Sequence, residues 1–188
     1  MIIIGITGSI ASGKTTASKI LSYRRGPLFS ADQVVKKLYK DKHFKKVIAQ
    51  KLNIVNKLNF KALLKKEISK NSVSLKKLEK IIHPRVRKEM KKFAKKNKNK
   101  KALFYEIPLL IESKLMKYFD VIIFIKAKKS IRLKRFKLKG GEERLFDILN
   151  KKQLSDMKKV KYCDHVVVNE KKISILKKKL LDIFALYA

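Results

Sequence analysis

The chain has 188 residues, of which 45% are hydrophobic, so it is long enough to bury a core and suits one α/β domain with a small insertion. It carries 50 Lys and Arg against 15 Asp and Glu, a formal net charge of +35 at pH 7. A single cysteine excludes an internal disulfide, His and Cys are too few for a zinc site, and no apolar run reaches the roughly 18 residues of a membrane span.

Lysine supplies most of the positive charge and is spread along the chain from Lys36 to Lys179. Specific recognition of phosphates and base edges favours arginine, because its planar guanidinium forms two parallel hydrogen bonds. Scattered lysine therefore indicates a composition bias at solvent-facing positions, and we expect neither a specific nucleic-acid partner nor a membrane partner. Weak, salt-dependent attraction to polyanions still follows from the charge.

The first predicted element is an apolar strand over residues 2–7, and the motif GSIASGKT follows it directly. The motif matches G-x-x-x-x-G-K-[ST], the pattern of a phosphate-binding loop, and a helical pattern comes next. Gly8 and Gly13 can adopt backbone angles that side chains forbid, so the loop amides can point at phosphate oxygens. We expect Lys14 to reach the β- and γ-phosphates of a nucleotide and Thr15 to bind Mg²⁺.

A weaker, edge-type strand is predicted over residues 27–30, and Asp32 follows it at the start of a helix over 32–40. In an open α/β sheet, this position lies at the carboxyl edge of the strands, where ligands bind. The carboxylate could accept the proton of an attacking hydroxyl or hold Mg²⁺ through water. It could equally cap the helix, and the residue type alone does not decide between these roles.

The interval from about residue 42 to 97 has several helical patterns, the last over 74–97, and no convincing strand. We interpret this interval as a helical insertion that covers a substrate. The lysine-rich stretch over 95–101 is then a solvated connector back to the sheet.

Three short apolar runs predict the remaining strands, at residues 103–107, 121–125 and 166–168. Each run is apolar on both faces, as is typical of parallel strands with helices on both sides. Helical patterns at 130–138, 142–152 and 171–187 alternate with these strands. The alternation predicts right-handed crossovers and an open, doubly wound sheet.

The segment over residues 130–141 is a basic helical pattern that ends in two glycines. Arg132, Arg135 and Lys139 are spaced so that one helix face would carry all three cations. A cationic helix followed by flexible residues indicates a mobile lid that supplies charge to a transferring phosphoryl group. An exposed basic helix without such a role is the alternative.

Several motifs occur together in a family-like order: GITGSIASGKTT, SAD at 30–32, HPRVR at 83–87, EIPLLIE at 106–112, Arg135 with Lys139, Gln153, and CDHVVVN at 163–169. On these motifs the chain resembles the dephospho-coenzyme A kinases over essentially its whole length. The resemblance implies a three-layer P-loop kinase fold with a five-stranded parallel sheet. It also implies one domain over residues 1–188, with the helical insertion at about 42–97 and a helical lid at about 130–150.

The same resemblance implies that the γ-phosphoryl group of ATP is transferred to the ribose 3′-hydroxyl of dephospho-coenzyme A with Mg²⁺, the last step of coenzyme A biosynthesis. The implied catalytic residues are Lys14, Asp32 as general base, and Arg135. Nucleotide contacts are implied for Gly8, Ala11, Ser12, Gly13, Lys14, Thr15, Thr16, Lys139 and Asn169. Acceptor contacts are implied for His83, Arg87, Pro108 and Glu112. We expect a cytoplasmic monomer, with an oligomer left open.

The chain departs from the family pattern at several positions. Ser30 stands where the family usually has a second acid, Arg132 replaces a usual glutamine, and Lys139 replaces a usual arginine. Ser9 and Ala11 replace glycines of the loop, although both glycines that the motif requires are present. Lysine keeps the charge of arginine but loses its fork, which weakens the expected contact of the lid with phosphate.

Other interpretations stay open at single residues and for the whole chain. His83, before Pro84, could end a helical turn, and Glu106 and Glu112 could be surface acids. Cys163 is expected to pack without acting as a catalytic thiol. The chain could also be a kinase for another small acceptor, such as a nucleoside monophosphate or a sugar acid. A basic nucleic-acid-binding protein that uses ATP only as a ligand is the third alternative.

Overall fold

The computed structural model describes residues 1–54, 60, 62–64, 67 and 72–187. The chain divides into two compact units, one formed by Met1–Ser30 with Asn97–Ala188 and the other by Ala31–Lys96. Because residues 55–59, 61, 65–66 and 68–71 are not among the described ones, part of the insertion predicted over 42–97 lies outside the described residues.

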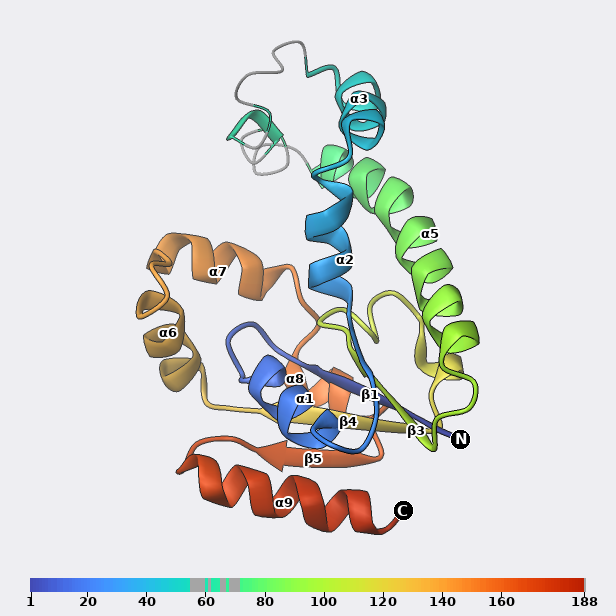
Figure 1. Cartoon of the computed structure of the whole chain (residues 1–188). Coiled ribbons are helices and arrows are strands. Elements are labelled where there is room, and N and C mark those ends of the chain that lie inside the picture. The colour runs from blue at the N-terminus through green and yellow to red at the C-terminus, as the bar shows by residue number, and fades with distance from the viewer. Residues whose placement is uncertain (55–59, 61, 65–66, 68–71, 188) are drawn as a thin grey trace. The chain divides into compact units, whose positions relative to one another are not determined.

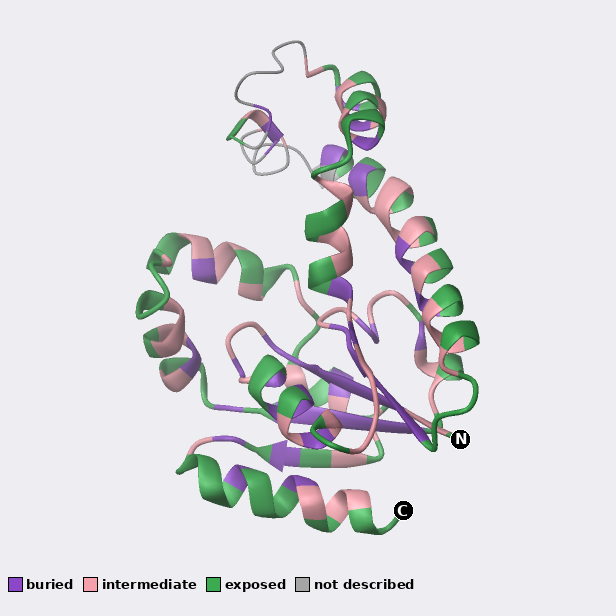
Figure 2. Cartoon of the chain, in the orientation of Figure 1, coloured by how far each residue is buried: buried purple, intermediate pink, exposed green. Residues whose placement is uncertain are grey.

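The first unit is built on a five-stranded parallel sheet with the strand order β2-β3-β1-β4-β5, of which Figure 1 labels β1, β3, β4 and β5. The strands are β1 (Ile2–Gly8), β2 (Leu28–Ser30), β3 (Ala102–Glu106), β4 (Val121–Lys126) and β5 (His165–Val168). The three middle strands are buried over most of their length, as continuous apolar runs should be (Figure 2). The parallel sheet confirms the predicted α/β fold class.

Helices α1 (Lys14–Ser22) and α9 (Ile173–Ala185) pack on each other and against one face of this sheet. Their buried residues share one core with alternate residues of β1 and β4, among them Ile4, Ile6 and Ile123. On the other face, a Cβ placed on Gly5 would come within 2.8 Å of Leu110 and 3.0 Å of Phe119. The chain after β3, which includes the 3₁₀ helix η1 (Met116–Tyr118), thus packs there, and α8 (Asp156–Val160) contacts β4.

Strand β5 departs from the prediction that every strand is covered on both faces. Val166 and Val168 are 40% and 42% exposed, whereas Val167 is buried with Leu176 and Leu180 of α9. The prediction was wrong for this edge strand because three consecutive valines have no period that distinguishes a one-sided strand from a two-sided one.

Helices α6 (Lys129–Lys137) and α7 (Glu143–Lys151) form the segment that was predicted as a lid. They contact each other through Phe136 and Phe146, whose ring centroids lie 5.7 Å apart. Gly140 has φ +79°, a left-handed conformation that commonly ends helices. Lys139 consequently lies in the turn after α6, so the predicted helix face with three cations was wrong.

The second unit contains α2 (Ala31–Leu38), α3 (Lys42–Lys51) and α5 (Ser72–Lys96), and its described residues include no strand. Its core is formed by apolar residues of α3, of α5 and of the described residues between them: Phe44, Ile48, Leu52, Phe60, Leu64 and Leu78. Helix α5 continues through His83 and Pro84, so the interpretation that His83 ends a helical turn was wrong. None of the described helices, even the 25-residue α5, has the length and apolar stretch that crossing a membrane requires.

Candidate active site

The loop between β1 and α1 approaches other backbone and side chains too closely for a Cβ at two positions. Gly8 has φ +151° and Gly13 has φ +99°. A Cβ on Gly8 would overlap the carbonyl oxygen of Ile125 in β4, and one on Gly13 would overlap the side-chain amide of Asn169. The two glycines of the motif are therefore required both by backbone conformation and by space.

Two polar side chains of the loop fit an anionic guest. Lys14 begins α1, is only 8% exposed, and its Nζ donates a hydrogen bond to the carbonyl oxygen of Ser9 at 2.9 Å. The Ser12 Oγ is buried and has no hydrogen-bond partner among the described residues. A buried ammonium group and an unpaired buried hydroxyl at the start of a helix suit phosphate oxygens, because these oxygens accept hydrogen bonds and carry negative charge.

Thr15 lies beside a carboxylate that sequence reasoning left undecided. The Thr15 Oγ1 donates to the Glu106 Oε1 at 2.5 Å, and Glu106, the last residue of β3, is only 4% exposed. The interpretation of Glu106 as a surface acid was wrong. A hydroxyl next to a carboxylate is the oxygen donor set that Mg²⁺ prefers, so these two residues fit the metal. The position of Glu106 at the carboxyl end of an apolar strand was the available sequence clue.

The carbonyl oxygen of Ser12 is the shared acceptor through which the predicted lid and the residue after β5 contact the loop. It accepts hydrogen bonds from the Asn169 Nδ2 at 2.8 Å and from the Arg135 Nη1 at 3.4 Å. Asn169 directly follows β5 and is 7% exposed, so its amide is fixed in place. Thr16 and Lys139, by contrast, have exposed side chains on α1 and in the turn after α6.

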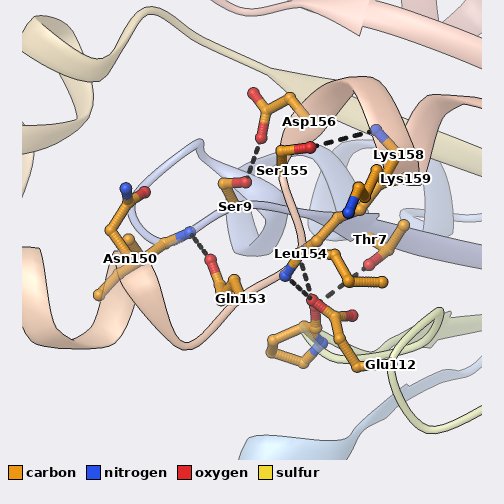
Figure 3. A network of polar contacts seen from close by, with 12 residues as sticks. Thr7, Ser9, Glu112, Asn150, Gln153, Leu154, Ser155, Asp156, Lys158 and Lys159 are labelled. Carbon is orange, nitrogen blue, oxygen red and sulfur yellow. Dashed lines mark hydrogen bonds and ion pairs between the residues drawn. The ribbon is translucent and has the colours of Figure 1, made fainter.

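A network of polar contacts ties the loop after β3 to the segment after α7 (Figure 3). The Thr7 Oγ1 donates to the carbonyl oxygen of Pro108 at 3.2 Å. The Glu112 Oε1 accepts from the backbone amide of Leu154 at 3.1 Å and pairs with the Lys159 Nζ at 2.7 Å. Lys159 is fully buried and the Glu112 side chain is 17% exposed, so the interpretation of Glu112 as a surface acid was wrong.

Arg132 is held inside the protein instead of facing a ligand. Its Nε donates to the carbonyl oxygen of Ala127 at 3.1 Å and its Nη1 to the Asn150 Oδ1 at 2.7 Å, while its guanidinium lies 5.6 Å from the ring centroid of Phe146. Burial lowers the pKa of Arg132, and the charge of Asp156 opposes that effect. This arginine therefore joins α6 to α7.

The remaining predicted residues belong to the second unit. Asp32 has an exposed side chain in the first turn of α2, two residues after the end of β2. His83 and Arg87 lie one turn apart on α5, and burial lowers the pKa of His83. The roles of these three residues toward a nucleotide or an acceptor stay predictions.

Comparison with known proteins identifies relatives of the whole chain. The family model of dephospho-CoA kinase matches residues 2–174. The dephospho-CoA kinase of Bartonella henselae is 34% identical over 187 residues, which cover 96% of this chain and 95% of that protein.

Two solved structures show the same fold. The crystal structure of TT1252 from Thermus thermophilus has a TM-score of 0.83 and 25% identity, and the match covers 100% of this chain and 98% of that one. The dephospho-CoA kinase from Campylobacter jejuni has a TM-score of 0.66 and 24% identity, with 97% and 95% covered.

Removal of the buried Lys159 ammonium group should destabilise the protein. Lys159→Met leaves the Glu112 carboxylate largely buried without its ion-pair partner, and we expect a loss of about 3–5 kcal/mol in the free energy of unfolding. Adding Glu112→Leu should recover part of that loss, because it also removes the unpaired charge. Urea denaturation followed by circular dichroism measures both changes. The control is Lys158→Met at the exposed neighbouring position, and an equal effect of the two single variants would contradict the role of the ion pair.

The single thiol should be unreactive in the folded protein. Burial, with a smaller contribution from Asp164, raises the pKa of Cys163 to about 12, and its Sγ donates to the carbonyl oxygen of Lys159 at 3.3 Å. A raised pKa keeps the thiol protonated at pH 8, so iodoacetamide should alkylate the folded protein at least about a hundredfold more slowly than the chain unfolded in urea. Mass spectrometry over time gives both rates, and equal rates would rule out this protection.

Proposed function

The chain belongs to the dephospho-CoA kinase family, and we propose how its own residues carry out the ATP-dependent phosphorylation of dephospho-coenzyme A that this family performs. The phosphoryl group goes to the ribose 3′-hydroxyl, and the products are coenzyme A and ADP. The observation that carries this proposal is the loop of residues 8–15, with its two sterically required glycines and its buried Lys14, in a chain that matches the family over residues 2–174.

The phosphates of ATP bind at the N-terminus of α1. Lys14 would exchange its contact with the Ser9 carbonyl for the β- and γ-phosphates, and the Ser12 Oγ would gain the acceptor that it lacks among the described residues. Thr15 and Glu106 would hold Mg²⁺, which when bound neutralises charge on the β- and γ-phosphates. The remaining nucleotide contacts are proposed for Gly8, Ala11, Gly13, Thr16, Lys139 and Asn169.

Asp32 is the proposed general base. Its exposed carboxylate follows β2 at the carboxyl edge of a parallel sheet, where acceptors bind in this fold class. It would accept the proton of the 3′-hydroxyl as the new phosphate ester bond forms and the bond to ADP breaks. The acceptor itself would be bound by residues of α5 and of the loop after β3: His83, Arg87, Pro108 and Glu112.

Arg135 is the proposed cation of the lid. Its guanidinium already reaches the phosphate loop, at the carbonyl oxygen of Ser12. When the nucleotide binds, a small movement of α6 would bring this guanidinium to the phosphoryl group that is being transferred. Its positive charge would stabilise the transition state there. Arg132 takes no part in this step, because its donors are already used within the protein.

We also propose the oligomeric state, the cellular location and the partners of the enzyme. We propose a monomeric enzyme in which Lys14, Asp32 and Arg135 of the same chain serve one site. The substrates ATP and dephospho-coenzyme A support a cytoplasmic location, and neither requires a nucleic-acid partner.

An acceptor assay tests the substrate directly. With Mg²⁺ and ATP, the protein should release ADP in the presence of dephospho-coenzyme A, and mass spectrometry should detect coenzyme A as the product. Nucleoside monophosphates and sugar acids should give only background release. A strong response to one of these acceptors, or stimulation of ATP hydrolysis by DNA or RNA, would instead favour one of the two alternative functions.

Replacement of the base tests the mechanism. Asp32→Asn should lower kcat by about a hundredfold to ten-thousandfold and leave the KM for ATP nearly unchanged, because the amide cannot accept the hydroxyl proton. Steady-state kinetics with both substrates measures the two constants. The matched control is Asp182→Asn on α9, an exposed acid far along the chain, which should behave as wild type. Wild-type turnover in Asp32→Asn would refute the assignment.

A further inference from the structure

Residues Ser9–Ala11 form the outer arm of the phosphate loop. Their backbone is held by side chains from a distant part of the chain. The backbone amide of Ile10 donates to the Gln153 Oε1 at 2.9 Å, and its carbonyl oxygen accepts from the Arg132 Nη1 at 3.4 Å. The Ser9 Oγ donates to the carboxylate of Asp156 (Figure 3). These partners all belong to the chain between the start of α6 and α8, so one segment holds both backbone polar groups of Ile10, which belong to two successive peptide units.

The next residue of this arm adopts a conformation that alanine disfavours. Ala11 has φ +57°, in the left-handed region where a Cβ crowds the neighbouring carbonyl oxygen. Glycine accepts this conformation freely, whereas alanine persists in it only where the surroundings determine it. A phosphate loop with alanine here would relax to another shape if its neighbouring peptide groups were released.

One of the side chains that hold the arm, Arg132, is itself held by further contacts. It is 6% exposed and bonded to Ala127 and Asn150, so its contact with Ile10 comes from a buried guanidinium that is already bonded elsewhere. The Ile10 amide, because it donates to Gln153, is not available to phosphate. The Gln153 Oε1 is therefore bonded to the backbone of the loop.

We propose that Gln153 is a positioning residue that, together with Arg132 and Asp156, holds Ser9–Ala11 in the strained form that receives the phosphates of ATP. The contacts of these three residues offset the free energy of the strain, so ATP binding does not have to reorganise the loop. The inference deepens the proposed function and rests on the loop of residues 8–15 binding the nucleotide.

The first experiment removes the acceptor atom and keeps the length of the side chain. Gln153→Met should raise the Kd for ATP about tenfold in calorimetry, the change expected when a backbone amide loses its partner. The KM for ATP should rise in parallel and kcat should change by less than about twofold, because positioning acts on binding. Gln153→Glu retains an oxygen acceptor and should stay within about threefold of wild type. Met157→Ala, 80% exposed in the same segment, is the control and should match wild type.

The second experiment repeats the substitution where the strain is absent. In an Ala11→Gly background the left-handed conformation no longer carries a penalty, so Gln153→Met should raise the Kd for ATP by only about threefold or less. A merely structural role of Gln153 predicts the same factor in both backgrounds. Equal factors would therefore overturn the proposal.

A measurement without nucleotide tests the contact itself. Amide hydrogen exchange of Ile10, followed by NMR, should be about tenfold faster in Gln153→Met than in wild type, because the amide is no longer bonded. An unchanged exchange rate, or an unchanged Kd for ATP, refutes the inference. Failure of the proposed function looks different: wild type would not phosphorylate dephospho-coenzyme A, or Lys14→Met would bind ATP as tightly as wild type does.

Discussion

The site depends on the close approach of the phosphate loop to the carboxyl ends of two strands. Gly8 lies against the carbonyl oxygen of Ile125 at the end of β4, and Gly13 lies against Asn169, which follows β5. Neither position has room for a Cβ, so the register of the parallel strands sets the shape of the loop. The Asn169 amide then fixes the Ser12 carbonyl, so contacts within the protein hold the loop in this shape. A loop whose shape is set by the protein suits phosphoryl transfer, which depends mainly on alignment and charge.

The few acidic residues carry more information about this site than the many lysines do. The chain has 15 acids against 50 basic residues, and three of the acids bond to defined partners around the loop. Glu106 accepts from Thr15, Glu112 pairs with buried Lys159, and the Asp156 carboxylate accepts from Ser9. Each contact joins segments that are far apart in the chain. The lysine excess is therefore a property of the protein surface, whereas the contacts of these three acids hold together the segments around the phosphate loop.

Sequence patterns predicted the layers of the fold better than the ends and faces of its elements. The apolar runs gave all five strands, and the weak run over 27–30 was correctly placed as an edge strand. The face of β5 was predicted wrongly, because consecutive valines carry no period. Lys139 was placed on a helix that ends two residues earlier, since a left-handed Gly140 stops it. The five-residue α8 was not predicted, because one short turn of helix leaves too weak a pattern.

The sequence by itself determined the phosphate loop, because eight contiguous residues contain the glycines, the lysine and the threonine that the geometry requires. It also placed Arg135 and Asn169 as candidates. Only the tertiary structure decided what these side chains contact, and only there did Glu106 and Gln153 acquire partners. The bond from Ile10 to Gln153 joins residues 143 positions apart, and the bond from Thr15 to Glu106 joins residues 91 positions apart. Such partners are set by strand register and by the paths of the connecting loops, which local patterns of residues do not encode.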